Sequence, residues 1–213
     1  KTGIVLDILE ARKKYVLTNY FKDTNKQDVK VFVSDMWEPY RDISTVFFQN
    51  ATQIVDKYHY VRQIMWALED TRKKVQKQFS KSHRIYFKRS KSLLTKRYEK
   101  LTDEQKTQVR IMLDVSADLS TAYFMKEDLT ILNIEDSEKQ KNELNNWILW
   151  AQDCPIERFN KCAATILNWY SGITNSLILP YTNGFTEGCN NRIKVLKRLA
   201  YGYTNFRRFR NRI

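Results

Sequence analysis

The sequence predicts an α/β fold in which a small, partly parallel sheet is interrupted by a large all-helical insertion, so that helix dominates overall. Two observations predict this class. Before residue 58, short runs rich in Val and Ile alternate with helical patterns, an order typical of parallel strands joined by helices. From residue 58 onward, apolar residues recur at helical spacing over about a hundred residues. The 213 residues have room for one sizeable domain with such an insertion.

Three short apolar runs have strand character. They cover residues 3–9, residues 29–34 and residues 53–55 with their flanks. Helical patterns lie between them, over residues 10–21 and residues 39–47. Strands that alternate with helices in this way are expected to lie parallel in one sheet.

A helical block is expected to follow, over residues 58–180. A capping box at Thr102 starts one of its helices, Ser137 marks another start, and Pro155 opens a helix that Gly172 ends. The helix after Thr102 is predicted to face the core with a single apolar stripe, formed by Val109, Met112, Val115 and Leu119.

The chain is strongly basic, with a formal net charge of +13. Nucleic acid is the partner that such a surplus favours most. No stretch approaches 18 consecutive apolar residues and no lipid-anchor motif is present, so a membrane partner is not expected. Residues 58–100 hold thirteen Lys or Arg against three acids. This stretch is either a second DNA-facing surface or a solvated charged face.

Three cysteines, Cys154, Cys162 and Cys189, are odd in number and lack C-x-x-C spacing. This pattern disfavours a disulfide framework and a zinc site, and it predicts buried thiols in a reducing cytosol. No P-loop, G-x-S-x-G, G-x-G-x-x-G or H-E-x-x-H motif occurs, so the sequence gives no support to nucleotide hydrolysis, acyl transfer or zinc proteolysis. The chain starts at Lys1 without an initiator Met and is expected to be a fragment.

Residues 183–198, read as a helix, separate into two faces. After Glu187 the sequence has no acid and eight Lys or Arg. A lone acid at the head of a basic, amide-rich face predicts a metal ligand beside bound phosphates. The alternative is a surface helix with Glu187 as an acid favoured by the helix dipole. One face is apolar, with Phe185, Cys189, Ile193, Leu196 and Ala200, and the opposite face carries Glu187, Asn190, Asn191, Lys194 and Arg198.

Acids also follow two of the predicted strands. Asp35 follows residues 29–34, at the strand end where parallel sheets bind ligands, and its carboxylate is either a metal or catalytic ligand or the cap of the next helix. Asp56 follows the next strand and precedes His59 by three residues. His59 can bind a metal, contact phosphate or brace a carboxylate, or it is a hydrogen-bonded structural His. Carboxylate oxygens such as those of Asp35 and Glu187 suit Mg²⁺.

Three segments carry a family resemblance. V-K-V-F-V-S-D-M-W-E-P-Y, Q-I-V-D-K-Y-H-Y-V-R and N-G-F-T-E-G-C-N-N-R-I-K-V-L-K-R, in this order, resemble the DDE transposases of bacterial insertion sequences in the ISL-three group. The resemblance implies a ribonuclease H-like fold, with Asp35 as the second acid of a catalytic triad and Glu187 as the third. It implies a partial core over residues 1–57, a helical insertion over 58–180 and a catalytic Glu helix with a basic segment over 181–213. Asp7 occupies the third-strand position, so the first acid and the N-terminal strands are expected before Lys1.

The resemblance also implies what the protein does. Asp35 and Glu187 are expected to hold Mg²⁺ or Mn²⁺ for cleavage and strand transfer of double-stranded DNA, at transposon ends and at a target. The fragment is expected to be inactive, and its metal site empty, without the first Asp. A homo-oligomer in a synaptic complex and a place at the bacterial nucleoid in the cytoplasm are further implications. Asp56, His59, Asn190 and Asn191 are expected to support the site, and DNA is expected to contact Arg192, Lys194, Lys197, Arg198, Arg207 and Arg208.

Two other functions fit the same residues. A non-catalytic nucleic-acid-binding module, decayed or domesticated, predicts binding with a steep salt dependence and no metal dependence. A metal-dependent nuclease of the same fold predicts cleavage without a joined product.

Overall fold

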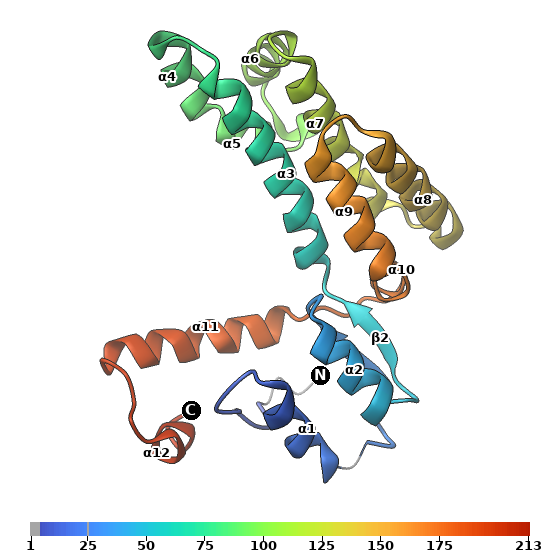
Figure 1. Ribbon diagram of the computed structural model, residues 1–213, viewed down its shortest axis with the longest axis vertical. Helices are drawn as coiled ribbons and strands as arrows, with labels where there is room; N and C mark the ends of the chain where they lie inside the picture. Colours follow the sequence, from blue (N-terminus) through green and yellow to red (C-terminus); the bar gives the residue numbers. More distant parts are fainter. Residues whose placement is uncertain (1–4, 25) are drawn as a thin grey trace. The chain divides into compact units, whose positions relative to one another are not determined.

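The computed structural model describes residues 5–24 and 26–213, and its chain divides into two compact units (Figure 1). Unit 1 contains Lys1–Asp56 and Leu179–Ile213, and unit 2 contains Lys57–Ile178. Helices dominate the structure, as the sequence predicts. A helix with both the length and the apolar character to cross a bilayer does not occur among the described residues.

Unit 1 contains a parallel pair of strands, which confirms the predicted strand direction. Strand β1 (Val31–Ser34) pairs with β2 (Thr52–Val55), with Val31 opposite Thr52 and Ser34 opposite Val55. Helix α2 (Glu38–Phe47) makes the crossover between them and carries a proline in its first turn, where the missing N–H has no helical partner to lose. Both strands therefore end at the same edge of the sheet.

A small hydrophobic cluster holds two helices of unit 1 against the sheet. Helix α1 (Lys14–Lys22) packs on α2 and buries Leu17 in this cluster. The sequence predicts that this helix begins at residue 10, but residues 10–13 are not helical and α1 begins at Lys14. The cluster has Leu17, Ile43 and Phe48 at its centre, with Leu9, Phe21, Val29, Phe32, Trp37, Tyr40, Phe47 and Ala51 packed against it.

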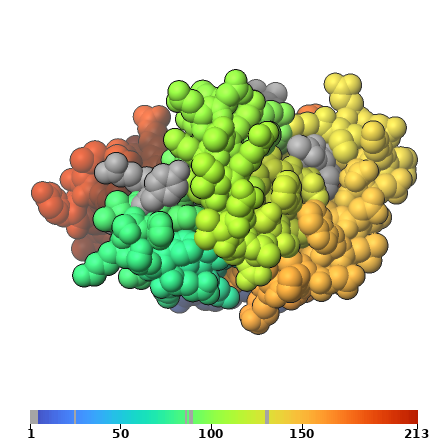
Figure 2. All heavy atoms as spheres, turned by 90° about the horizontal axis from the view of Figure 1, so that it is seen from above, coloured from blue at the N-terminus to red at the C-terminus, as the bar shows by residue number. Residues whose placement is uncertain are grey.

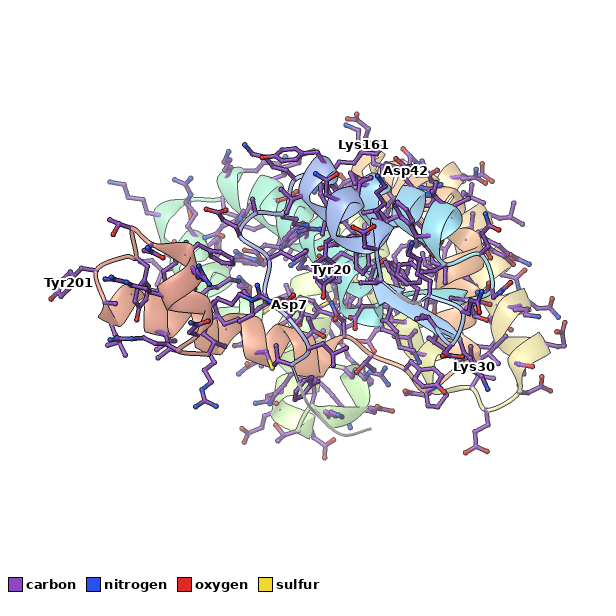
Figure 3. All side chains as sticks on the ribbon, turned by 90° about the horizontal axis from the view of Figure 1, so that it is seen from below. Asp7, Tyr20, Lys30, Asp42, Lys161 and Tyr201 are labelled. Atoms are coloured by element: carbon purple, nitrogen blue, oxygen red, sulfur yellow. The ribbon has the colours of Figure 1, made fainter. Side chains whose placement is uncertain are left out.

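The strand predicted over residues 3–9 is wrong for the part that the structure describes. Residues 5–9 are irregular, Leu6 is 93% exposed, and residues 3 and 4 lie outside the described residues. An apolar run forms a strand only where a neighbouring strand completes its hydrogen bonds, and the described sheet contains β1 and β2 alone. Asp7 therefore lies on no strand. Its Oδ1 pairs with Arg210 Nη2 at 2.8 Å on α12 (Phe206–Arg210), beside Tyr20 (Figure 3).

Unit 2 is entirely helical in its described part and packs around α3 (Lys57–Lys77). Helix α3 contacts α7 (Ala117–Glu127) and α9 (Glu157–Asn168) along its length. It buries Tyr60, Ile64, Ala67 and Leu68, the apolar positions that open it. Figure 2 shows the green, yellow and orange atoms of this unit as one continuous surface. The other elements are α4 (Lys81–Arg89), α5 (Lys91–Thr95), η1 (Tyr98–Lys100), α6 (Asp103–Asp114), η2 (Asp128–Asn133), α8 (Ser137–Asp153) and α10 (Tyr170–Ile178).

The capping box at Thr102 is confirmed, but the helix that follows it is shorter than predicted. The Thr102 hydroxyl accepts the N–H of Gln105 at 3.3 Å, and the Gln105 side chain accepts the N–H of Thr102 at 3.3 Å. Helix α6 ends at Asp114, and Ser116 caps α7 separately. Val115 lies between the two helices and is 50% exposed, so the prediction of one continuous apolar stripe is wrong there.

The helix start predicted at Ser137 is confirmed, since α8 begins at that residue. Its cap is the preceding residue, Asp136, whose carboxylate accepts the N–H groups of Glu138 and Lys139 at 2.9 and 3.1 Å. An ionised side chain in that position satisfies two N–H groups, more than a hydroxyl usually does. The prediction that Gly172 ends a helix is wrong, because Gly172 is buried inside α10, and the preceding helix α9 ends at Asn168.

Candidate active site

Asp35 lies directly after β1, at the edge of the sheet where both strands end. Its side chain is 24% exposed, and its backbone carbonyl accepts the N–H of Trp37 at 2.9 Å. Trp37, and not Asp35, occupies the N-cap position of α2, and no side chain caps that helix. The alternative that Asp35 is a helix cap is therefore wrong.

Arg12 is a neighbour of Asp35 that the sequence did not reveal. Its Nη2 lies 3.2 Å from Asp35 Oδ2. Its guanidinium also stacks against two rings, at 4.4 Å from the centre of Trp37 and 4.9 Å from that of Tyr40. Burial raises the pKa of the Tyr40 phenol, and the neighbouring Arg12 acts in the opposite direction. These aromatic contacts hold the Arg12 charge beside the Asp35 carboxylate.

Asn183 links both strand ends to the helix that carries Glu187. It occupies the N-cap position of α11 (Gly184–Leu199). Its backbone N–H donates to Asp56 Oδ2 at 2.6 Å, and its side-chain Nδ2 donates to Asp35 Oδ1 at 3.5 Å. Asp56 is buried, and its own N–H extends the pairing of the strands by donating to the carbonyl of Ser34 at 3.0 Å. The start of α11 is thereby attached to the carboxyl ends of β1 and β2.

Glu187 lies in the first turn of α11 and is half-buried. Its N–H donates to the carbonyl of Asn183 at 2.9 Å, which places it one helical turn beyond the attached residue. A carboxylate oxygen of Glu187 lies within 4.8 Å of one of Asp35. Two oxygens that share one Mg²⁺ at about 2.1 Å lie no more than about 4.2 Å apart, which is close to this limit. The two acids singled out in the sequence therefore lie at a spacing that suits one divalent cation.

Comparison with known proteins decides the family. A family model described as Transposase, of the ISL-three group, matches residues 1–213. The chain belongs to this transposase family. The transposase for insertion sequence element IS1557 of Mycobacterium tuberculosis is 33% identical to it over 110 residues, which cover 52% of this chain and 25% of that protein. The transposase for insertion sequence element IS1001 of Bordetella parapertussis is 26% identical over 182 residues, which cover 83% of this chain and 45% of that protein.

The matched relatives are longer than this transposase chain. It spans less than half the length of either one. No solved structure matches the chain.

Helix α11 of this transposase chain is more exposed than its sequence pattern predicts. None of its residues is buried, and Phe185, at the head of the predicted apolar face, is 54% exposed. Cys189, Ile193, Leu196 and Ala200 are only half-buried. The apolar residues therefore recur along one side of the helix, as predicted, but the described part of unit 1 does not bury them. Asn190 and Asn191 are exposed as well.

The cations predicted to bind DNA are all exposed. In the described part of the chain, no carboxylate lies within ion-pairing distance of them. Each of these Lys and Arg side chains therefore keeps its charge available to another molecule. They are Arg192, Lys194, Lys197 and Arg198 on α11, and Arg207 and Arg208 on α12.

His59 belongs to unit 2, where it lies in the first turn of α3. It is buried, and its Nδ1 lies 3.3 Å from Nη2 of Arg62. This contact fits a hydrogen-bonded structural role. A direct role of His59 in the transposase chemistry stays a prediction.

Proposed function

We propose that Asp35 and Glu187 are two metal-binding carboxylates of a DDE-type catalytic site, in a ribonuclease H-like core into which unit 2 is inserted. The proposed activity is cleavage and strand transfer of the DNA of an insertion sequence. The observation that supports this proposal most is the pair of carboxylate oxygens within 4.8 Å, contributed by a strand end and by the first turn of a distant helix. Membership of the transposase family supplies the class of reaction.

The donor set fits Mg²⁺ or Mn²⁺, because both cations prefer oxygen ligands. Arg12 and Asn183 each contact a different oxygen of Asp35. When bound, the divalent cations activate the attacking water or DNA 3′-hydroxyl and stabilise the leaving oxygen.

The chain's own residues position this chemistry. Asn183 holds α11 against Asp56 and Asp35, so Glu187 keeps its place relative to the strand ends. Asn190 and Asn191, exposed one turn further on, are proposed to orient Glu187 or the scissile phosphate. The exposed cations of α11 and α12 are proposed to bind the phosphates of double-stranded DNA. Two transposon ends are proposed to be paired by a homo-oligomer.

The test uses a full-length transposase that carries this chain and DNA with the ends of its insertion sequence. Asp35→Asn and Glu187→Gln should each lower Mg²⁺-dependent cleavage by roughly 10³-fold or more, because each removes a metal ligand worth several kcal/mol in the transition state. DNA binding in EDTA should persist in both variants. Asp42→Asn is the matched control, since Asp42 lies in unit 1 and pairs with Lys14 at 2.5 Å.

Cleavage that survives both Asp35→Asn and Glu187→Gln would overturn the assignment. Binding without any metal-dependent cleavage by the unaltered protein would support the non-catalytic module instead. Cleavage without joined product would identify a nuclease.

A further inference from the structure

The C-terminal end of α11 carries a tyrosine in a backbone conformation that favours glycine. Tyr201 has φ 50°, and Gly202, which follows it, has φ 97°. Two hydrogen bonds close the helix end: Gly202 N–H donates to the carbonyl of Lys197 at 2.9 Å, and Tyr201 N–H to that of Arg198 at 3.1 Å. This is a Schellman motif, whose left-handed residue is usually glycine. A bulky aromatic residue in that position is strained.

Packing does not compensate for this strain. The side chain of Tyr201 is fully exposed, and Figure 3 shows it pointing away from the end of α11 into solvent. Backbone strain at an exposed residue contributes nothing to stability, and such strain is concentrated at functional sites.

Tyr201 belongs to a hollow lined by cations. Lys194, Lys197 and Arg198 line it together with Tyr201 and Gly202, and its volume is about 530 Å³. Lys194, Lys197 and Arg198 follow helical i, i+3 and i+4 spacing, so they share one face of α11, and Tyr201 follows the end of that helix. The long stems of Lys and Arg make apolar walls, while their charged ends reach the rim.

The charges of this hollow point to an anionic ligand. Like charges three and four residues apart repel one another. In the described residues no carboxylate lies close enough to pair with Lys194, Lys197 or Arg198. The helix dipole favours cations in the last turn, but it gives no reason for a strained tyrosine beside them. An exposed aromatic ring surrounded by cations is what an unpaired nucleotide requires, because the ring stacks on the base and the cations hold the phosphates.

We propose that the C-terminal end of α11 binds an unpaired nucleotide of a DNA strand. Its base stacks on Tyr201, and its flanking phosphates pair with Lys194, Lys197 and Arg198. The inference rests on the proposed function for one point, that the nucleic acid is DNA. The inference adds two points to the proposed function: the bound nucleotide is unpaired, and Tyr201 contacts its base.

The test measures binding of a fluorescently labelled single-stranded oligonucleotide and of the matching duplex, in EDTA so that no cleavage occurs. Tyr201→Asn should weaken single-strand binding by roughly 5- to 150-fold, the range for loss of one stacked base. Asn tolerates the left-handed conformation, so the helix end is kept. Tyr201→Phe should bind as the unaltered protein does, because it keeps the ring. Tyr15→Asn is the control, because Tyr15 is also an exposed tyrosine, 62% exposed, but lies in an ordinary helix.

A stability measurement separates a binding role from a structural one. Tyr201→Gly should leave the Tm unchanged or raise it, because glycine relieves the positive φ. A fall in Tm for both Tyr201→Gly and Tyr201→Asn would overturn the proposal. Equal losses for single strand and duplex, or no loss for Tyr201→Asn, would overturn it too. These readouts need no catalysis, so the proposal can fail while Asp35→Asn still abolishes cleavage, and the reverse can also occur.

Discussion

Unit 2 contains a cation that is buried against a carboxylate of the same unit, whereas the cations described on α11 of unit 1 are exposed and have no carboxylate within ion-pairing distance. In unit 2 Arg72 is 6% exposed, and its guanidinium donates to Glu69 at 2.7 and 2.9 Å, to Gln76 at 2.8 Å and to the carbonyl of Phe87 at 3.1 Å. Among the described residues, the cations of α11 have no such carboxylate. A cation in a basic stretch can therefore stabilise the fold or remain available to a ligand. The presence or absence of a carboxylate beside it distinguishes the two roles.

The same contrast occurs within residues 58–100. The sequence leaves two interpretations of this stretch open, a second DNA-facing surface or a solvated charged face. Arg72, within this stretch, is part of the interior and leaves no charge for a ligand. Lys73, Lys74 and Lys77 on the same helix are exposed.

The largest expected effect tests the buried cation of unit 2, Arg72. Arg72→Ala should lower the free energy of unfolding by about 3–5 kcal/mol, because it removes both guanidinium hydrogen bonds from the Glu69 carboxylate, whose side chain is only 12% exposed. Urea unfolding followed by circular dichroism measures this loss. Lys73→Ala is the matched control, since Lys73 is 58% exposed and lies 3.7 Å from the same Glu69, and it should cost about 1 kcal/mol or less. Similar losses in the two variants would contradict the assignment of Arg72 to the structure alone.

Local patterns in the sequence predicted much of unit 1. The runs before Asp35 and Asp56 form β1 and β2, and the pattern between them forms α2, because each is decided by neighbouring residues and by burial on the sheet. The run at residues 5–9 had similar composition but is no strand, since a strand also depends on a partner elsewhere in the chain. Composition alone could not distinguish these cases.

The candidate site shows the same division. Asp35 and Glu187 were predictable because a strand end and a helix face each leave a local pattern. Asn183 and Arg12 were not, because their contacts join residues far apart in sequence: Asn183 reaches Asp56 across 127 positions and Arg12 reaches Asp35 across 23. An Asn before a helix reads as an ordinary cap, although its side chain makes no cap hydrogen bond here.

The second largest expected effect tests the exposed cations of α11. Replacing Lys194, Lys197 and Arg198 together by Gln should reduce the slope of log affinity against log salt for duplex DNA by about 0.9 for each phosphate that these cations neutralise. Fluorescence anisotropy at several salt concentrations measures the slope. The matched control is the triple Gln variant of Lys73, Lys74 and Lys77, which removes the same charge from unit 2. If the control lowers the slope equally, DNA binding follows net charge and α11 has no special role.

The smallest effect concerns the pH dependence of the buried pair. The hydrogen bond from Arg72 lowers the pKa of Glu69 below its usual 4.5, against the opposing effect of burial. A carboxylate with a lowered folded-state pKa contributes stability above the unfolded value and loses it as the pH falls through the folded pKa. The difference in unfolding free energy between the unaltered protein and Glu69→Gln should therefore stay constant from pH 7 down to about 5.5 and narrow below about 4.5.

Glu157→Gln is the control for this acid dependence, because Glu157 forms an exposed pair with Lys161 at 2.6 Å in the same unit. The contribution of the Glu157–Lys161 pair to the free energy of unfolding should disappear when salt is added at pH 7, since ions screen exposed charges. The contribution of Glu69 should persist, because its carboxylate is only 12% exposed and solvent ions have little access to it. A Glu69 effect that salt removes as readily as that of Glu157 would mean that the Arg72 pair behaves as a surface pair. The buried and the exposed cations would then differ only in whether a carboxylate lies within ion-pairing distance of them.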